Sequence, residues 1–222
     1  VKAVSSKGRH LSAVPSESSI SSSTSADRDR ELVNAVIAGD TRASAAFYDR
    51  LKPVIERTLG RLLGSRDPAY EDLFQQTLVA LVESIDRFRN ECPLEAWASI
   101  VAARIVYRHI RRRRLERRLF VVSDVEGEIL PRAAPAAPAL RSAIRRVEAH
   151  LREVSEERSW TFLLHDVMGF GLAEVASITG ASESAAQSRL VRGRKEIHSR
   201  IAQDAELVSL FEDLGWSREG EQ

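Results

Sequence analysis

Residues 171–197 carry a pattern that constrains their fold closely: a helix, a glycine turn and a second helix. Apolar side chains recur at helical spacing over 172–178, which predicts an amphipathic helix with one buried face. Gly180 follows, where the end of a helix favours a residue in the left-handed conformation. Ser182 or Ser184 can cap the next helix, because a serine hydroxyl accepts a hydrogen bond from a free backbone N–H. The stretch therefore predicts a helix-turn-helix.

The second helix of this motif has two unlike faces. Small or apolar residues at steps of four, three and four define the side that should pack inward: Ala186, Leu190, Gly193 and Ile197. The opposite side carries short hydrogen-bonding residues and long basic ones: Ser184, Ser188, Arg192 and Lys195, with Gln187, Arg189 and Arg194 on its flanks. Such groups on the free face of a second helix suit the reading of base edges in the major groove. The motif therefore favours DNA as the ligand over the alternative, a plain packing role.

Composition excludes several other classes of protein. The chain has 222 residues, of which 43% are hydrophobic, and this is enough for one large domain or two small ones. Cys92 is the single cysteine, so no intrachain disulfide can form. Neither a membrane-spanning apolar run nor a signal peptide is recognisable, so we expect a cytoplasmic protein without membrane insertion. Histidines are scattered and no phosphate-binding or nucleophile motif is present, so we expect no metal, no cofactor and no enzymatic activity.

Five segments follow one another along the chain. The serine-rich residues 1–26 are expected to be disordered, and residues 27–119 show helical periodicity. Prolines and alanines without a period make residues 120–140 a flexible linker. Residues 141–203 are helical again, and the tail 204–222 holds a last amphipathic turn or two. The chain is therefore predicted to be all-α, with two small helical domains joined by the linker.

Within the first helical segment, three features set the expected helix boundaries. Pro53 should interrupt or restart a helix, because proline lacks a backbone N–H. Apolar residues at alternating steps of four and three predict one helix over 71–88. The segment Asn90–Pro93 should end it, and a long helix from about Leu94 should run into an arginine cluster.

That long helix carries an aromatic and basic stripe: Trp97, Ile100, Arg104, Tyr107 and Arg111. Aromatic rings stack on unpaired bases and arginines contact phosphates, so the stripe suits single-stranded nucleic acid. This local charge is more informative than the net charge of +1, which averages over unlike segments. A solvated basic helix end, with Trp97 in the core, is the open alternative.

In their order and spacing these segments resemble the sigma factors of bacterial RNA polymerase. Seven short motifs resemble sigma region 2: Glu31-Leu32-Val33, Ala38-Gly39-Asp40, Ala46-Phe47-Tyr48, Glu71-Asp72-Leu73-Phe74-Gln75-Gln76, Asp86-Arg87-Phe88, Ala96-Trp97 and His109-Ile110-Arg111-Arg112-Arg113-Arg114. Two motifs in the helix-turn-helix resemble region 4: Ser188-Arg189-Leu190 and Arg192-Gly193-Arg194. A linker with no domain between these regions is similar to the small extracytoplasmic-function (ECF) group.

The resemblance implies a role for each matching residue. One set would dock on the β′ clamp helices of the polymerase core: Asp72, Leu73, Gln75, Gln76 and Leu78. The β flap of the core would be a further partner of the chain. A second set would melt the promoter −10 element and hold its non-template strand: Asn90, Trp97, Ile100, Arg104, Tyr107, Arg108, Arg111, Arg112, Arg113 and Arg114. A third set would contact the −35 element: Ser184, Gln187, Ser188, Arg189, Arg192, Arg194 and Lys195. Small sigma factors are often held inactive by an anti-sigma protein, which leaves a partner of that kind open.

Departures from the family pattern fall where promoter preference is set. The family commonly has Arg-Asn where this chain has Ala103-Arg104, and Thr-Val-Lys where it has Ala185-Ala186-Gln187. The promoter sequence therefore cannot be transferred from the family. A stand-alone helix-turn-helix regulator, binding a palindrome as a dimer, stays open as an alternative function. A helical adaptor that binds polyanions without sequence preference is a third.

Overall fold

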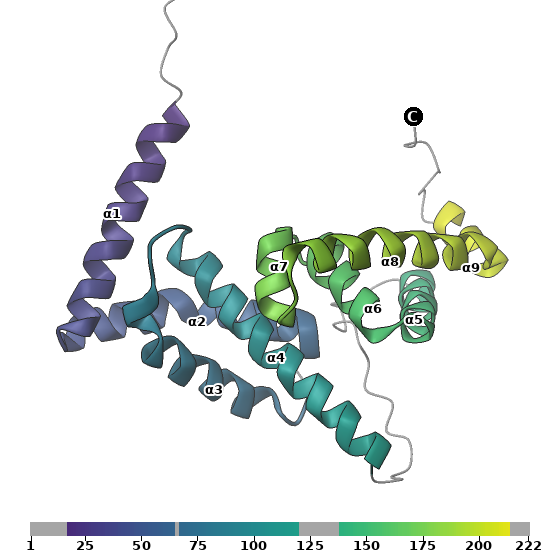
Figure 1. The fold of residues 1–222 in the computed structure, drawn as a ribbon, viewed down its shortest axis with the longest axis horizontal. Coiled ribbons are helices and arrows are strands. Elements are labelled where there is room, and N and C mark those ends of the chain that lie inside the picture. Colours follow the sequence, from purple (N-terminus) through teal and green to yellow (C-terminus); the bar gives the residue numbers. More distant parts are fainter. Residues whose placement is uncertain (1–16, 65–66, 120–137, 214–222) are drawn as a thin grey trace, which may run out of the picture.

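The computed structural model describes residues 17–64, 67–119 and 138–213, and all regular structure in these ranges is helical, as predicted (Figure 1). The first half of the chain forms α1 (Glu17–Ile37), α2 (Thr41–Leu63), α3 (Tyr70–Glu83), the 3-10 turn η1 (Ile85–Arg87) and α4 (Leu94–Leu119). The second half forms α5 (Pro138–Glu153), α6 (Glu156–Phe162), the π-helical turn η2 (Leu163–Val167), α7 (Leu172–Thr179), α8 (Glu183–Gln203) and α9 (Ala205–Asp213). None of the helices in these ranges combines the length and apolarity needed to cross a membrane.

The body of the first half is formed by α2, α3 and α4, and α1 packs against α2 (Figure 1). Asp40 caps α2 by accepting hydrogen bonds from the backbone N–H groups of Arg42 at 2.7 Å and Ala43 at 3.2 Å. One side of α2 is fully buried, with Leu51 and Ile55 both at 0% exposure. Each such aliphatic side chain contributes about 1.5–3 kcal/mol on burial, so this side of α2 anchors the helical body.

Two expected boundaries in this half are wrong. The helix α2 runs through Pro53, which removes the hydrogen bond to the carbonyl of Asp49. Both residues are exposed, so water can bind the free carbonyl while the buried opposite side holds the helix together. The predicted helix over 71–88 ends earlier, at Glu83, because Ser84 leaves the helical conformation (φ −114°, ψ 8°) and the chain continues as the 3-10 turn η1.

The segment boundaries at the ends of the halves also shift. The helix α1 begins at Glu17, within the segment 1–26 that was expected to be disordered, while residues 1–16 lie outside the described ranges. Serine is only moderately unfavourable in a helix, so a helix fixed by packing farther along can extend into serines. Of the predicted linker, 138–140 belong to α5 and 120–137 lie outside the described ranges. The tail contains the expected amphipathic turns as α9.

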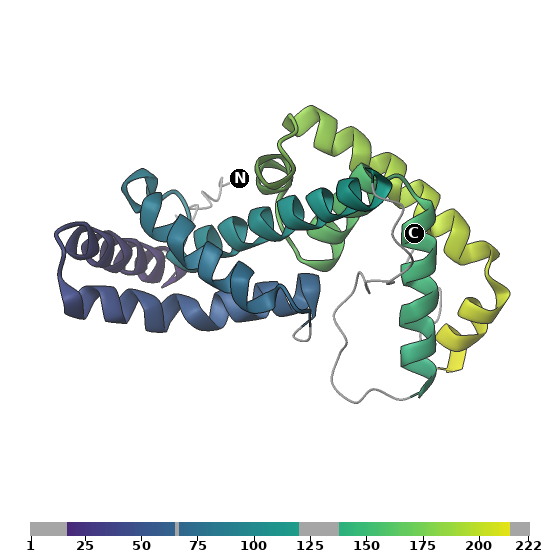
Figure 2. The same ribbon diagram turned by 90° about the horizontal axis from the view of Figure 1, so that it is seen from below.

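The two halves pack against each other. Buried residues of α2 to α4 and of α6 to α8 form one hydrophobic cluster, and Figures 1 and 2 show α7 beside α4. A second, smaller cluster joins α5 and α6 to α8 within the second half, around Leu151, Val154 and Ile197. The linker is therefore not the only connection between the two helical domains.

Candidate nucleic-acid interface

The outer face of α8 is an exposed polar surface. It carries five of the residues predicted to contact the −35 element: Ser184, Gln187, Ser188, Arg192 and Lys195. Within the described ranges, Arg192 and Lys195 form no ion pair. Val191 lies among them and is also exposed. Free cationic groups beside hydroxyl and amide groups make this surface suited to duplex DNA.

The two remaining predicted −35 residues lie at the edge of that surface. Arg189 is half-buried. Arg194 donates from Nε and Nη2 to the carboxylate of Asp166 in η2, at 2.8 and 2.5 Å. The hydrogen bond from Arg194 holds the pKa of Asp166 below its usual value. Arg194 therefore ties α8 to η2, and its Nε and Nη2 groups are engaged by Asp166.

Close packing against α6 and α7 sets the direction of the α8 surface. The buried residues of α8 are the four that their spacing predicts: Ala186, Leu190, Gly193 and Ile197. Gly193 lies against α6, where an added Cβ would come within 3.2 Å of the Arg158 carbonyl oxygen. Gly180 has the predicted left-handed φ, at 70°, and Ser182 is the residue that caps α8, accepting from the N–H of Ala185 at 3.2 Å.

The start of α4 and the loop before it carry the first predicted −10 residues. The loop Asn90–Pro93 separates η1 from α4, as predicted, and Asn90 is half-buried. Trp97 is half-buried and contacts Phe88, with ring centroids 5.3 Å apart. Ile100 is also half-buried. This part of the stripe combines core packing with a partly accessible surface.

The second half of the chain covers the middle of the same stripe. Tyr107 is only 5% exposed and meets Trp160 of α6 edge to face, with centroids 5.3 Å apart. Arg104 donates from Nη2 to the Ser177 hydroxyl of α7 at 2.5 Å, and its buried Nε has no hydrogen-bond partner among the described residues. Burial, and then the nearby charge of Arg108, lowers the pKa of Arg104. Tyr107 is therefore inaccessible to DNA in this arrangement, and Arg104 is half-buried against α7.

The arginine-rich end of α4 divides into paired and unpaired side chains. Three arginines form ion pairs: Arg112 with Glu116 at 2.8 Å, Arg113 with Asp67 at 3.1 Å and Arg114 with Glu156 at 3.7 Å. Arg108 and Arg111 are exposed and form no ion pair in the described part of the chain. Of the predicted phosphate contacts on α4, these two are the most available.

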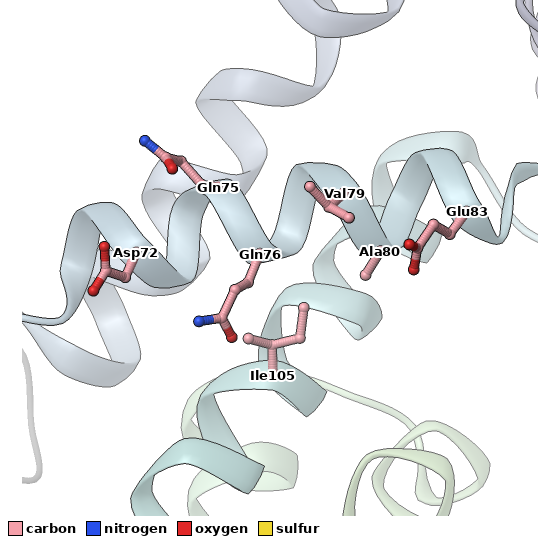
Figure 3. Close-up of a pocket in the computed structure, with 7 residues that line it drawn as sticks. All are labelled: Asp72, Gln75, Gln76, Val79, Ala80, Glu83 and Ile105. Carbon is pink, nitrogen blue, oxygen red and sulfur yellow. The ribbon is translucent and has the colours of Figure 1, made fainter.

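A groove of about 500 Å³ lies between α3 and α4, and Figure 3 shows the residues that line it. Three of the residues predicted to contact polymerase core line this groove: Asp72, Gln75 and Gln76. Gln76 points toward Ile105 of α4, whereas Gln75 points away from it (Figure 3). The groove therefore has an acidic and amide rim around an apolar floor.

The remaining two predicted core contacts are placed differently. Leu73 is 1% exposed and belongs to the hydrophobic core, so its side chain is not accessible to a partner in this structure and its role in core binding stays a prediction. Leu78 is half-buried against the same core. Sequence reasoning missed three lining residues: Val79, Ala80 and Ile105. An exposed valine close to polar residues of α3 is the signal that could have identified the groove.

Both halves of the chain are similar to known proteins. Residues 47–116 match the family Sigma-70 region 2, and residues 144–197 match the family Sigma-70, region 4. The RNA polymerase sigma factor CnrH of Cupriavidus metallidurans is 24% identical over 187 residues, which cover 81% of this chain and 97% of CnrH. The ECF RNA polymerase sigma factor EcfG of Rhodopseudomonas palustris is 26% identical over 145 residues, covering 64% of this chain and 76% of EcfG.

Among solved structures, the sigma factor RpoE of Bartonella quintana, in complex with the anti-sigma factor NepR, shares the fold. The TM-score is 0.52 at 22% identity, over 72% of this chain and 98% of that chain. Sigma factors are not a family of catalytic enzymes. Two sigma regions in the family's order, together with relatives named as sigma factors, identify the chain: it belongs to the sigma-70 family of RNA polymerase sigma factors, in the ECF group.

Proposed function

We propose that this sigma factor binds the core of bacterial RNA polymerase in the cytoplasm and directs it to promoters through three surfaces. The groove between α3 and α4 receives the β′ clamp helices. The loop Asn90–Pro93 and α4 open the −10 element, and α8 reads the −35 element. The observation that carries the proposal is the exposed face of α8. Arg192 and Lys195 on this face form no ion pair within the described ranges, and the opposite side of the helix is buried.

The α8 face supports sequence reading rather than simple charge attraction. An arginine that binds guanine through two hydrogen bonds discriminates against a wrong base by about 1–3 kcal/mol. The serines and glutamine on the same face provide short hydrogen-bonding groups at neighbouring positions. A face of this kind needs a fixed orientation, which the tight contact of Gly193 with α6 provides.

The α3–α4 groove supports binding of a partner helix. Its floor includes Val79, which is 55% exposed, and the apolar side chain of Ile105. Asp72 and Glu83 place negative charge near its two ends, where a partner's basic residues can pair with them (Figure 3). An apolar floor with an acidic rim fits an amphipathic helix that carries basic residues.

Co-purification of the full chain with core polymerase, followed by mapping of transcript starts, tests the function. The wild type should bind core and produce transcripts from a defined promoter. Val79→Arg should abolish co-purification, while Ile37→Arg, at an equally exposed apolar position on α1, should not: the two side chains are 55% and 54% exposed. If both variants still co-purify with core polymerase, the groove is not the surface that binds core.

A stand-alone regulator gives the opposite result. Such a protein binds duplex DNA tightly without polymerase and as a dimer on a palindrome.

Because the fold is shared with a sigma factor solved with its anti-sigma factor NepR, a second protein that co-purifies with this chain should also be identified. Absence of both core binding and promoter-specific transcripts would reject the proposed function.

A further inference from the structure

Both ends of the loop Asn90–Pro93 are fastened to one turn of α1. At the start of the loop, the Asn90 side-chain amide donates to the backbone carbonyl of Ala26, with an Nδ2–O distance of 2.7 Å. Directly after the loop, the backbone N–H of Leu94 donates to Asp29 Oδ2 at 2.9 Å. Ala26 and Asp29 are three residues apart and so lie on one side of α1. Ala26 and Asp29 together form the α1 clip.

Asp29 is fully bound in this position. Its side chain is 1% exposed, and its second oxygen accepts from Arg50 Nη2 at 2.6 Å. Arg50 also donates to both carboxylate oxygens of Glu95, in the first turn of α4, at 2.5 and 3.0 Å. A buried carboxylate is tolerated only when it is paired and hydrogen-bonded, and Asp29 meets both conditions. The N-terminus of α4 is thus capped by a residue 65 positions earlier in the chain.

The loop itself has an unusual backbone that the α1 clip stabilises. Among the described residues, Asn90 is the only one other than glycine with a positive φ, at 59°. Residues held in this conformation persist where the surrounding structure fixes them, and they cluster at functional sites. The hydrogen bond to Ala26 is the contact that holds the Asn90 side chain.

We propose that Asp29 is a positioning residue for promoter opening, acting through the α1 clip on Asn90–Pro93 and on the start of α4. The proposal rests on the proposed function, in which this loop captures −10 bases. A loop that is fixed before it meets DNA loses less conformational freedom on binding and fits fewer wrong bases. Ala26 and Asp29 precede residues 47–116, which match sigma-70 region 2, so the clip lies outside the matched region.

Asp29→Ala in the full chain tests the proposal, with Asp40→Ala as the matched control. Asp40 is also a helix-capping aspartate, but it caps α2 rather than α4. The first measurement is hydrogen exchange of the backbone amides of residues 90–92 and 94–97 in the free protein. Asp29→Ala should speed exchange of the Leu94 amide by roughly fivefold or more, the fold-change that corresponds to losing one helix cap. Asp40→Ala should leave that amide unchanged.

The second measurement uses holoenzyme on the promoter mapped for the wild type. It is the ratio of transcripts from that promoter to transcripts from the same promoter with one changed −10 base. The ratio should fall about fivefold with Asp29→Ala and stay constant with Asp40→Ala. Because both promoters meet the same protein sample, a smaller folded fraction alone does not change the ratio.

Each outcome decides a separate point. Unchanged exchange at Leu94 in Asp29→Ala overturns the α1 clip, and faster exchange with an unchanged promoter ratio overturns its role in promoter opening. If Asp29→Ala does not fold, Asp29→Asn replaces it. The asparagine amide keeps an oxygen that can accept from Leu94 but loses the charge facing Arg50. Smaller changes in the Leu94 exchange rate and in the promoter ratio, in the same directions, are then expected. A wild type without promoter-specific transcripts defeats the proposed function instead, and the exchange measurement still tests the clip.

Discussion

The basic faces of α8 and α4 differ in how accessible they are. On α8, Arg192 and Lys195 point into solvent without an ion pair in the described ranges. On α4, Arg104 and Tyr107 are covered by α6 and α7, and the exposed charge is confined to the end of the helix. The basic face of α8 is therefore accessible along its length, whereas that of α4 is partly covered by the second half of the chain. If α4 opens the −10 element as proposed, this difference predicts that access of DNA is more restricted at α4 than at α8.

The largest expected effect is at the exposed face of α8 that carries Arg192 and Lys195, called the open face. Arg192→Ala should cost about 1–3 kcal/mol of binding at one −35 base pair, if this arginine binds a guanine edge. Lys195→Ala, the matched cation one turn farther along α8, should weaken all sequences alike and reduce the salt dependence. Affinities of both variants for a set of singly substituted −35 duplexes provide the measurement. Uniform weakening by Arg192→Ala would make it a phosphate contact.

The buried side of α8, where Gly193 packs against α6, gives the next prediction. Gly193→Ala places a Cβ 3.2 Å from the Arg158 carbonyl oxygen and should lower the free energy of unfolding by about 1–3 kcal/mol. Gly60→Ala in α2 meets nothing within 4 Å and should raise it by about 0.5–1 kcal/mol. Urea unfolding measures both changes. Equal effects in the two variants would mean that the α6 contact does not hold α8 in place.

A pair of variants at Ser177 addresses the covered face. Ser177→Asp should form an ion pair with Arg104 and strengthen the contact between α4 and α7, whereas Ser177→Lys should repel Arg104 and weaken it. Exposed charge pairs contribute about 0.2–1 kcal/mol, so we expect the rate of open-complex formation to change by at most about fivefold, slower for Asp and faster for Lys. Changes in the same direction for both variants would show that covering Arg104 does not limit promoter opening.

The two faces also differ in how far the sequence predicts them. The buried residues of α8 can be predicted from their spacing alone, because they all belong to a single helix. The covering of α4 does not, since Arg104 and Ser177 are 73 residues apart and meet only through tertiary packing. Leu73 shows the same limit: sequence similarity placed it on a binding surface, and the packing of α3 placed it in the core.

The smallest expected effect concerns Arg194, which belongs to the open face but is held by Asp166. The pKa of Asp166 is below its usual value of 3.8, mainly because of the hydrogen bond from Arg194. The stabilisation is therefore present above about pH 4 and is lost as the pH falls through the lowered pKa. Asp166→Asn should be less stable than the wild type by no more than about 1 kcal/mol at pH 6, because Arg194 is partly exposed.

The difference should shrink as the pH falls below 4, and urea-unfolding midpoints at several pH values measure it. Duplex binding then separates the two roles of Arg194. Asp166→Asn releases the guanidinium and should preserve or raise −35 affinity, whereas Arg194→Gln should lower it by the loss of one phosphate contact and flatten the salt dependence. Equal −35 affinity in Arg194→Gln and the wild type would restrict Arg194 to anchoring α8, and Arg192 and Lys195 would then be the cations of the open face.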